Sequence, residues 1–287
     1  MNPIQLRQMT ADDLYAADEL RRLAGWNQTL EDWRRLLSLE PDGCFLGLQN
    51  NKVIGSVTTT TYGRELAWIG MMLVHPDHRK QGIGKILMSQ AVNYLQARKV
   101  KCIKLDATPA GRPLYEKFGF LPESTLTRCE RSADSRTAVQ GNDIRNLRNL
   151  VDSDQAAIEQ IDTAACGVSR SRLIESLVKQ SCAALVWLDC GKVAGWGLMR
   201  AGTNADYLGP INCPSTDGAV SLLKGLLSAA QNRPVIWDVP GGNPAAVAAA
   251  RQLDFECRRQ LTRMRLGPEI VVLKPESQFA IAGPASG

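Results

Sequence analysis

The second half of the chain repeats the short motifs of the first half in the same order, and this repeat restricts the possible folds more than any other feature. The segment Lys-Val-Ile-Gly at residues 52–55 returns as Lys-Val-Ala-Gly at residues 192–195, about 140 positions later. Other pairs with similar spacing are Gly25 with Gly167, Trp68-Ile69-Gly70 with Tyr207-Leu208-Gly209, and Gly119-Phe120 with Asp254-Phe255. The matches predict a duplicated domain, and 287 residues suffice for two hydrophobic cores of ordinary size.

The first half has the residue patterns of a mixed sheet flanked by helices. Thr10 with Asp13 and Thr29 with Asp32 have capping-box spacing, so we expect two helices before the main sheet. Helical periodicity over residues 82–98 predicts a long helix between two strands, which makes a right-handed parallel crossover. The β-rich runs that we expect to form strands are residues 4–9, 44–48, 53–62, 66–74 and 100–105, followed by a last strand pair through Arg128.

These patterns predict an α+β chain of two tandem domains, each a mixed, mostly antiparallel sheet flanked by helices. We place the first domain at residues 1–132 and the second at residues 140–267, because the intervening run, Ser132 to Val139, has the composition of a linker. Residues 268–287 are rich in Gly, Pro, Ala and Ser, and we expect them to form a loose tail.

Composition narrows the possible partners and the compartment. The net charge is only +5 and no Lys and Arg stripe is present, which argues against nucleic acid as a partner. The eight cysteines show no CxxC spacing, so we expect reduced thiols, no zinc site and a cytoplasmic protein. No signal-like N-terminus and no run of about 18 apolar residues is found, so we expect no membrane partner. The oligomeric state stays open.

Glycines and basic residues lie between the expected strand 66–74 and the long helix, in the run Arg79-Lys80-Gln81-Gly82-Ile83-Gly84-Lys85. The unpaired N–H groups and the dipole of a helix N-terminus favour an anion there. The two glycines have no Cβ to block a phosphate, and the three cations would add donors, so the run suits a diphosphate. The same residues also fit a plain strand-to-helix turn. A Rossmann dinucleotide site is disfavoured, since no acidic residue lies on a second parallel strand about 20 residues on.

The run from Arg79 to Gly84 fits the R/Q-x-x-G-x-G/A signature, and in this the chain resembles the GNAT superfamily of N-acetyltransferases. The resemblance implies acetyl-CoA as the cofactor, with the diphosphate of coenzyme A bound by residues 79–85. It also implies that the strand before the loop is splayed from its neighbour. The main chain of Met72, Leu73 and Val74 would then contact the pantetheine arm as an added strand does.

A second GNAT-like element, Leu114-Tyr115-Glu116-Lys117-Phe118-Gly119-Phe120, follows the crossover strand, where we expect a short helix. It resembles the LYxxxGF motif of the family, which implies that Tyr115 donates a proton to the departing thiolate. The alternative is a half-buried tyrosine that only packs. Upstream, the family often has an Asn where this chain has Thr108, and this difference weakens the cofactor contact expected at Thr108.

The resemblance supplies no general base. The position at which some relatives carry a Glu is Trp68 in this chain. Glu65, at the start of the same strand, could act through a water molecule but is more readily explained as a solvated turn residue. His75 and His78 flank a proline without a third ligand, so we expect no metal site.

The acceptor side of the superfamily is covered by the loop between the first two helices. In this chain the loop reads Gly-Trp-Asn-Gln and resembles that of a subgroup of tandem bacterial acetyltransferases. By this resemblance Trp26 and Asn27 contact the substrate, although Trp26 can equally anchor the two helices. Asp106, at the end of the crossover strand, can attract a cationic amine or cap the turn that follows.

The second half lacks the residues that would bind the cofactor. Residues 210–218, which follow Tyr-Leu-Gly, contain no R-x-x-G-x-G run and no basic cluster. Asp217 would repel a phosphate at the start of a helix, and residues 243–255 contain no tyrosine. We therefore expect the second domain to keep the fold without binding acetyl-CoA.

Together these features predict an enzyme that transfers the acetyl group of acetyl-CoA directly to the primary amine of a small molecule. A protein lysine or N-terminal acetyltransferase is the alternative among enzymes. A non-catalytic module that binds or senses acetyl-CoA is the alternative of another class, because the sequence offers no carboxylate base.

Overall fold

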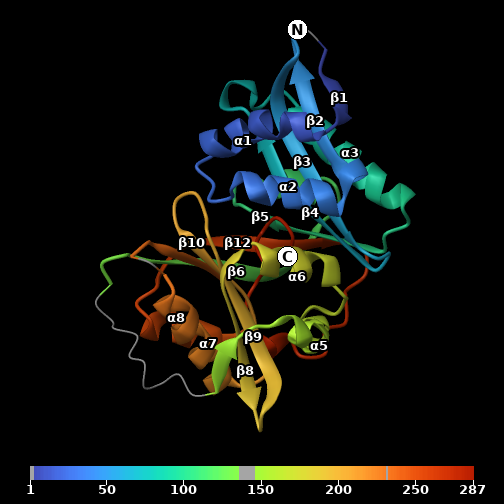
Figure 1. Ribbon diagram of the computed structural model, residues 1–287. Helices are drawn as coiled ribbons and strands as arrows, with labels where there is room; N and C mark the ends of the chain where they lie inside the picture. Colours follow the sequence, from blue (N-terminus) through green and yellow to red (C-terminus); the bar gives the residue numbers. More distant parts are fainter. Residues whose placement is uncertain (1–2, 136–145, 231) are drawn as a thin grey trace. The chain divides into compact units, whose positions relative to one another are not determined.

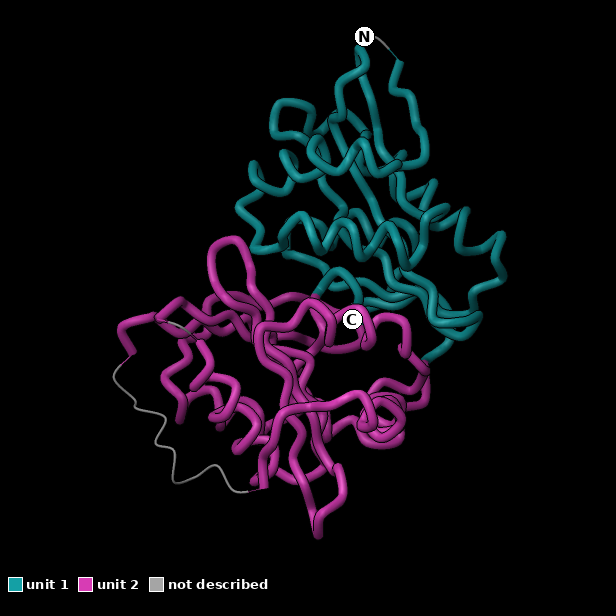
Figure 2. Tube along the Cα trace, viewed as in Figure 1, with its two compact units in different colours: residues 1–122, 264–269, 284–287 teal, residues 123–263, 270–283 magenta. Residues whose placement is uncertain are grey.

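The computed structural model describes residues 3–135, 146–230 and 232–287 (Figure 1). The chain forms two compact units, and each of them contains segments from both halves of the sequence (Figure 2). Unit 1 comprises Met1–Pro122, Met264–Glu269 and Pro284–Gly287, and unit 2 comprises Glu123–Arg263 and Ile270–Gly283. Of the linker expected at residues 132–139, residues 136–139 lie outside the described residues.

Unit 1 contains a sheet with the strand order β1-β2-β3-β4-β5, and the C-terminal end of β12 (Glu256–Leu266) lies beside β5. The pairs from β1 to β4 are antiparallel, and β4 and β5 are parallel. This confirms the antiparallel meander and the parallel crossover. The strands are β1 (Gln5–Gln8), β2 (Cys44–Gln49), β3 (Lys52–Tyr62), β4 (Leu66–Val74) and β5 (Cys102–Ala107).

Helices pack on both faces of the sheet of unit 1. Leu87 and Leu95 of α3 are fully buried in a core that includes Ile103 of β5. On the other face, α1 and α2 bury Leu20 and Trp33 in a second core with residues of β2 and β4. The helices are α1 (Leu14–Leu23), α2 (Leu30–Leu39), α3 (Ile83–Ala97) and α4 (Arg112–Glu116), with short 3-10 turns at Ala11–Asp13, Pro41–Gly43 and Pro76–His78.

The helices and strands from β7 to β12, most of them in unit 2, follow the same order as those from β1 to β6. The sheet of unit 2 runs β12-β6-β11-β10-β9-β8-β7, with β10 and β11 parallel to each other. The strands are β6 (Leu121–Arg131), β7 (Leu147–Asn149), β8 (Ser181–Asp189), β9 (Lys192–Arg200), β10 (Asp206–Asn212), β11 (Val235–Pro240) and β13 (Gln278–Ala280). The helices are α5 (Gln155–Cys166), α6 (Ser171–Lys179), α7 (Thr216–Ser228) and α8 (Pro244–Gln252), with 3-10 turns at Asp152–Asp154 and Pro275–Ser277.

The duplication extends to individual side chains. Arg7 binds Asp13 in unit 1 and Arg148 binds Asp154 in unit 2, both at 2.6 Å between NH1 and Oδ2. The paired positions Gly119 and Asp254 both have positive φ, of 84° and 59°, where a short helix gives way to a strand. These equivalent contacts confirm a tandem repeat of one α+β fold.

The last strand of the first half differs from the expectation of a strand pair. Residues 121–131 form the single strand β6, which pairs antiparallel with β11 from Leu126 opposite Pro240 to Arg131 opposite Val235. Its other neighbour is β12. Both partners lie more than a hundred residues further along the chain, and a local pattern contains no information about such pairing.

The last twenty residues, for which the composition predicts a loose tail, have several ordered contacts. Residues 278–280 form β13 and pair with β10. Tyr62 Oη donates to Ser286 O at 2.5 Å, and Trp68 Nε1 donates to Pro284 O at 3.0 Å. The small residues of this segment explain these contacts, because they allow its main chain to approach other strands closely.

No helix among the described residues is long and apolar enough to cross a membrane. The same residues contain no group of three His, Cys, Asp or Glu side chains that could hold a metal ion.

The Arg7 and Asp13 pair predicts how the stability of unit 1 depends on pH. The hydrogen bonds from Arg7 lower the pKa of Asp13 from 3.8 to about 2, so the carboxylate stabilises the fold above about pH 4 and this contribution is lost as the pH falls through about 2. Asp13→Asn is expected to reduce the free energy of unfolding by about 1 kcal/mol at pH 7, a value discounted because Arg7 is 44% exposed. Urea denaturation from pH 7 to 2 measures this difference, with the exposed Asp12→Asn as control. If Asp13→Asn reduced the free energy of unfolding equally at pH 7 and at pH 2, the predicted pH dependence would be contradicted.

Candidate active site

The pairing of β4 with β5 covers only the first part of both strands. Their register ends where Trp68 lies opposite Lys104, whereas β4 continues to Val74 and β5 to Ala107. The other edge of β4 remains paired with β3 up to Val74. Among the described strands, none pairs with the β5-facing edge of β4 beyond Trp68. The main chain of this edge is therefore available to an extended ligand.

Met72, Leu73 and Val74 lie on this unpaired part of β4. A bulge precedes them at Met71, which has φ 45° and whose carbonyl accepts a hydrogen bond from Ser56 Oγ at 2.9 Å. Leu73 is buried in the core of α1 and α2, and Met72 and Val74 pack against the core of α3. Since these side chains pack in the two cores, a ligand at this edge would meet main-chain groups.

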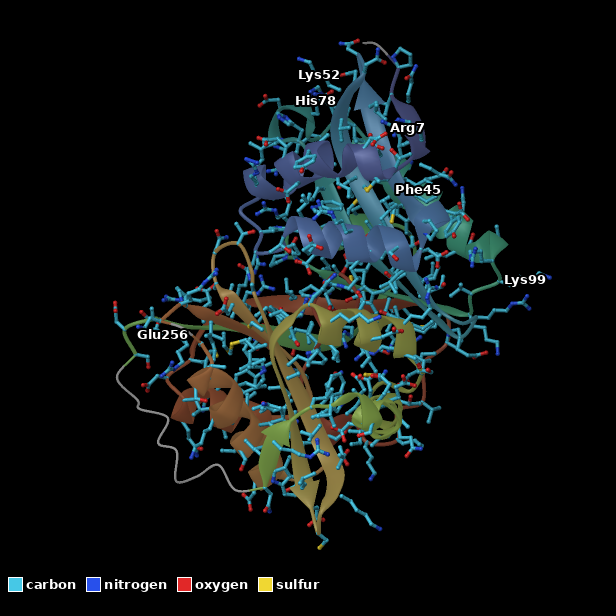
Figure 3. The ribbon with its side chains drawn as sticks, viewed as in Figure 1. Arg7, Phe45, Lys52, His78, Lys99 and Glu256 are labelled. Atoms are coloured by element: carbon cyan, nitrogen blue, oxygen red, sulfur yellow. The ribbon has the colours of Figure 1, made fainter. Side chains whose placement is uncertain are left out.

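The loop between β4 and α3 brings cations to the start of α3 (Figure 3, where His78 marks the loop). Gly82 caps the helix with φ 83°, and a Cβ at this position would meet no atom within 4 Å. Lys80 and Lys85 are exposed and form no ion pair with a described residue. Arg79 Nε donates to Val74 O at 3.2 Å, and Gln81 is exposed. The open helix N-terminus and the two lysines fit an anionic group.

Gly84 packs closely against a neighbouring element, a contact that the sequence pattern does not indicate. A Cβ at Gly84 would lie 3.3 Å from Leu114 Cδ2 and 3.9 Å from Val74 Cγ2. The missing side chain therefore allows α3 to pack against α4, next to the buried Ile83. Of the two glycines, only Gly82 leaves open space on the loop.

Tyr115 lies in α4 beside Thr108, close to the end of β5. Thr108 Oγ1 accepts a hydrogen bond from Gly111 N at 3.1 Å, and a Cβ at Gly111 would lie 3.4 Å from Tyr115 Oη. Tyr115 is 9% exposed, and the centroid of its ring lies 6.4 Å from that of Phe120. Burial raises the pKa of Tyr115 to about 12. Because of this high pKa, the hydroxyl carries a proton at neutral pH. It has no hydrogen-bond partner among the described residues, so it can give this proton to a ligand.

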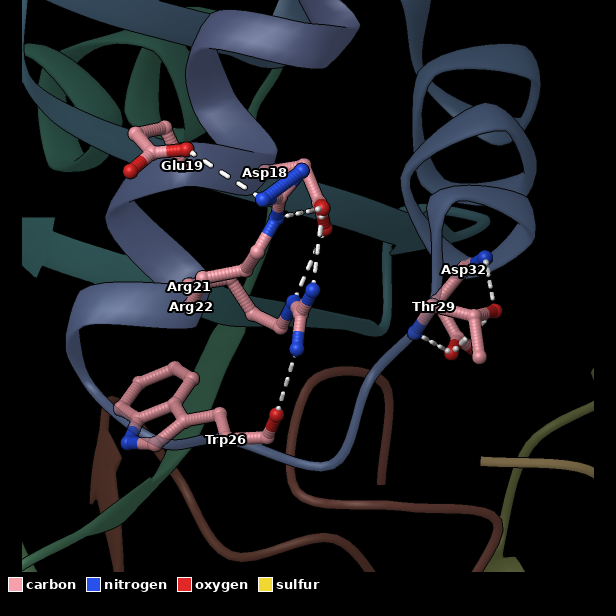
Figure 4. Close-up of polar contacts among 7 residues, drawn as sticks. All are labelled: Asp18, Glu19, Arg21, Arg22, Trp26, Thr29 and Asp32. Carbon is pink, nitrogen blue, oxygen red and sulfur yellow. Dashed lines mark hydrogen bonds and ion pairs between the residues drawn. The ribbon is translucent and has the colours of Figure 1, made fainter. Parts of the chain in front are cut away.

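The loop between α1 and α2 is held by an arginine (Figure 4). Arg21 binds the carboxylate of Asp18 through Nε at 2.8 Å and donates from NH1 to Trp26 O at 2.9 Å. The side chain of Trp26 packs against the core of α1 and α2, and Asn27 is buried. Capping of α2 by Thr29 and Asp32 fixes the end of the loop. Both interpretations of Trp26, as an anchor of the two helices and as a substrate contact, are compatible with this geometry.

Trp68 is the last residue of β4 that is paired with β5, so it marks the point where the two strands separate. Lys104 opposite it is buried, and Asp106 follows two residues later on the same face of β5. Glu65 binds Lys101 at 2.8 Å, and its side chain is 56% exposed. This agrees with a surface turn residue at Glu65.

Residues Pro284–Gly287 lie beside Trp68, at a position that the sequence pattern does not indicate. They belong to unit 1, and their carbonyl groups accept the hydrogen bonds from Trp68 and Tyr62 described above. Their sequence, Pro-Ala-Ser-Gly, has no motif that could have revealed this.

Unit 2 has the same separation of parallel strands, and there the chain itself fills it. β10 pairs with β11 only as far as Leu208 opposite Trp237. Beyond this point β13 pairs antiparallel with β10, with Ile211 opposite Ala280. The other edge of β10 is paired with β9. β13 therefore lies on the edge that faces β11, which corresponds to the unpaired edge of β4.

Side chains hold β13 in this position. Trp237 Nε1 donates to Phe279 O at 2.9 Å, and Asn243 Nδ2 donates to Gln278 O at 3.0 Å. The adjacent helix α7 is capped by Ser215, whose Oγ accepts a hydrogen bond from Gly218 N, and it carries Asp217 in its first turn. Both the occupied edge and the negative charge oppose binding of a second diphosphate compound.

The two units predict unequal binding of coenzyme A. We expect calorimetric titration of the whole chain to give about one site per chain. Among the described residues, unit 1 combines the unpaired edge of β4 with a basic helix N-terminus, whereas β13 covers the corresponding edge of β10 in unit 2. Lys80→Glu with Lys85→Glu should weaken binding at that site without uncovering another. Two equivalent sites per chain would contradict the assignment of unit 2.

The fold and the motifs agree with comparisons to known proteins. The model of the acetyltransferase (GNAT) family matches residues 6–120, and that of an acetyltransferase (GNAT) domain matches residues 158–280. The chain is 29% identical to the uncharacterized N-acetyltransferase YitH of Bacillus subtilis over 222 residues, which are 76% of this chain and 75% of that protein. It is 28% identical to the holothin acyltransferase of a Pseudoalteromonas species over 134 residues, 45% of each chain.

A solved structure from Pyrococcus horikoshii, assigned to the acetyltransferases, shares the fold of the whole chain. It has a TM-score of 0.84 and 24% identity, and the match covers 100% of this chain and 97% of that one. The matches in both halves agree with the repeated strand order and with the loop before α3. The chain thus belongs to the GNAT family, as an acyl-CoA-dependent N-acetyltransferase with two tandem GNAT domains.

Proposed function

We propose that unit 1 transfers the acetyl group of acetyl-CoA directly to the primary amine of a small molecule. One observation carries the proposal: the free edge of β4 leads to an open, basic helix N-terminus, and α4 with Tyr115 packs against the start of that helix. A donor with an amide arm, a diphosphate and a thioester fits this order of groups.

The residues of unit 1 fit acetyl-CoA group by group. Acetyl-CoA supplies an acetyl thioester when it is bound. Lys80, Lys85 and the N–H groups at the start of α3 hold the diphosphate, while Met72 to Val74 bind the amides of the arm through their main chain. Tyr115 keeps its proton up to high pH and donates it to the sulfur of the leaving group.

Direct transfer requires a neutral amine beside the thioester and no covalent enzyme intermediate. Trp26 and Asn27 on the loop after α1 and Asp106 at the end of β5 are the proposed contacts of the acceptor. No carboxylate stands at the position of Trp68, so we propose that the amine loses its proton to solvent or through water. All eight cysteines are free, which supports a cytoplasmic location for the reaction.

A small acceptor is favoured over a protein. One relative is named for acyl transfer to holothin, and its name refers to no protein acceptor. The alternatives are acetylation of protein lysines or N-termini, and a module that binds acetyl-CoA without turnover.

The test is thiol release from acetyl-CoA with a panel of acceptors. Amino acids and polyamines represent small amines, and peptides with free N-termini or lysines represent proteins. Turnover with at least one small amine, at a higher kcat/KM than with any peptide, supports the proposal. Preference for peptides would favour the protein acetyltransferase, and coenzyme A binding without turnover on any acceptor would favour the sensing module.

A further inference from the structure

Residues Pro284–Gly287 cover part of the sheet of unit 1 next to the point where β4 and β5 separate. Trp68 Nε1 donates to Pro284 O at 3.0 Å, and Tyr62 Oη donates to Ser286 O at 2.5 Å. Ser286 is buried, with 4% of its surface exposed. Two strands thus hold the short segment by hydrogen bonds to its main chain.

Gly70 makes this close approach possible. A Cβ at Gly70 would lie 2.4 Å from Ala285 O and 2.8 Å from Ala285 Cα, distances that no real side chain occupies. The segment therefore lies directly on the face of β4 to which the side chain of residue 70 would point. Any residue larger than glycine at this position would force the segment away.

This face is the one that carries the acceptor loop. Ala285 packs against the same core of α1 and α2 as Trp26 does. Tyr115, in contrast, belongs to the core of α3 on the other face of the sheet. The segment and the loop after α1 are thus on one side of the sheet, and the proposed proton donor comes from the other side.

We propose that Pro284–Gly287 forms a fixed wall of the acceptor site and restricts the acceptor to compact amines. This inference rests on the proposed function and specifies its substrate class. A peptide acceptor needs an extended, uncovered surface to lie on, and the chain's own main chain occupies the surface above Trp68 and Gly70. An amine with few atoms around the nitrogen needs only the space next to the separated strands.

Two sets of variants release the wall by different means. Gly70→Ala displaces the segment through steric overlap with Ala285. Tyr62→Phe with Trp68→Phe removes both hydrogen bonds and keeps aromatic rings at both positions. The matched control is Gly47→Ala on β2, where a Cβ would make only ordinary contacts at 3.7 Å or more. Hydrogen exchange of the amides of residues 285–287 reports the release directly.

The readout is the ratio of kcat/KM for a lysine peptide to kcat/KM for the best small amine. In the released variants we expect this ratio to rise at least about tenfold, with the KM for acetyl-CoA within about twofold of the wild-type value. The proposed wall would be wrong if a variant exchanged the amides of residues 285–287 fast and still kept the ratio within about threefold of wild type. If one set of variants does not fold, the other decides the question.

Failure of the proposed function has a different signature. If wild type already prefers peptides, the small-amine proposal is wrong, whatever the variants do. If wild type prefers a small amine and the released variants keep the same preference, the function stands and the wall is wrong.

Discussion

Tyr115→Phe is expected to slow the acetyl transfer step by about 10²–10³-fold and to leave acetyl-CoA binding within about twofold of wild type. The substitution removes a hydroxyl that has no partner among the described residues, and it keeps the buried ring that packs 6.4 Å from Phe120. Because burial raises the pKa of Tyr115 to about 12, the phenol stays protonated at neutral pH. It can therefore act as an acid, and its contribution should be lost only as the pH rises through about 12.

The measurement is turnover at saturating acetyl-CoA and saturating amine, together with thermal unfolding of the same preparation. Tyr94→Phe is a matched control, since Tyr94 Oη donates to Glu40 at 2.6 Å inside unit 1 and has no role in the proposed site. That control should lower stability by about 1 kcal/mol and leave turnover per folded molecule unchanged. Turnover of Tyr115→Phe within about threefold of wild type would mean that the proton comes from elsewhere, with solvent as the next candidate.

Local signals in the sequence were enough to predict most of the elements of unit 1. Asn50 and Asn51, with φ of 52° and 60°, make the tight turn between β2 and β3 that their residue types favour. Thr29 and Asp32 cap α2 as their spacing predicts. In these cases the residues that determine the structure are neighbours in the chain.

The pairing of β6 and β12 could not be predicted in the same way. β6 follows the crossover of the first half but pairs with β11, and the end of β12 lies beside β5 in unit 1. The residues that would pair β6 locally and those that do pair it have the same β-rich character. The choice between them depends on the packing of whole units, which no short pattern contains.

In the candidate site, too, features that depend on neighbouring residues could be predicted and features that depend on distant residues could not. The run from Arg79 to Lys85 and Tyr115 could be proposed as site residues from the sequence, because a loop at a helix N-terminus and a short helix are local structures. The packing of Gly84 against Leu114 could not be predicted, since Leu114 comes from another element. The position of residues 284–287 cannot be predicted from local signals, because it depends on Gly70 and Trp68, more than two hundred residues earlier.

Charge reversal at the start of α3, by Lys80→Glu with Lys85→Glu, is expected to weaken coenzyme A binding by about 10²-fold. Both side chains are exposed and form no ion pair within the described structure, so the fold loses no contact. At the protein surface two charges about 4 Å apart interact by about 4 kcal/mol, and salt screening reduces this value. When two lysines become glutamates, we therefore expect the binding free energy of coenzyme A to weaken by roughly 3 kcal/mol. This corresponds to the expected loss of about 10²-fold in affinity.

The control variant must change the net charge by the same amount as the loop variant, at positions far from the loop. Arg64→Glu with Lys99→Glu does so, because Arg64 lies in the turn before β4 and Lys99 follows the C-terminal end of α3 (Figure 3). The 15 residues of α3 alone separate Lys99 from the loop by about 22 Å, which exceeds the screening length of about 10 Å at 0.1 M salt. Calorimetric titration with coenzyme A at two salt concentrations should show a large loss only for the loop variant, and the loss should shrink as salt is added. Equal weakening in both double variants would mean that net charge alone attracts the ligand, and the diphosphate would then have to bind elsewhere on unit 1.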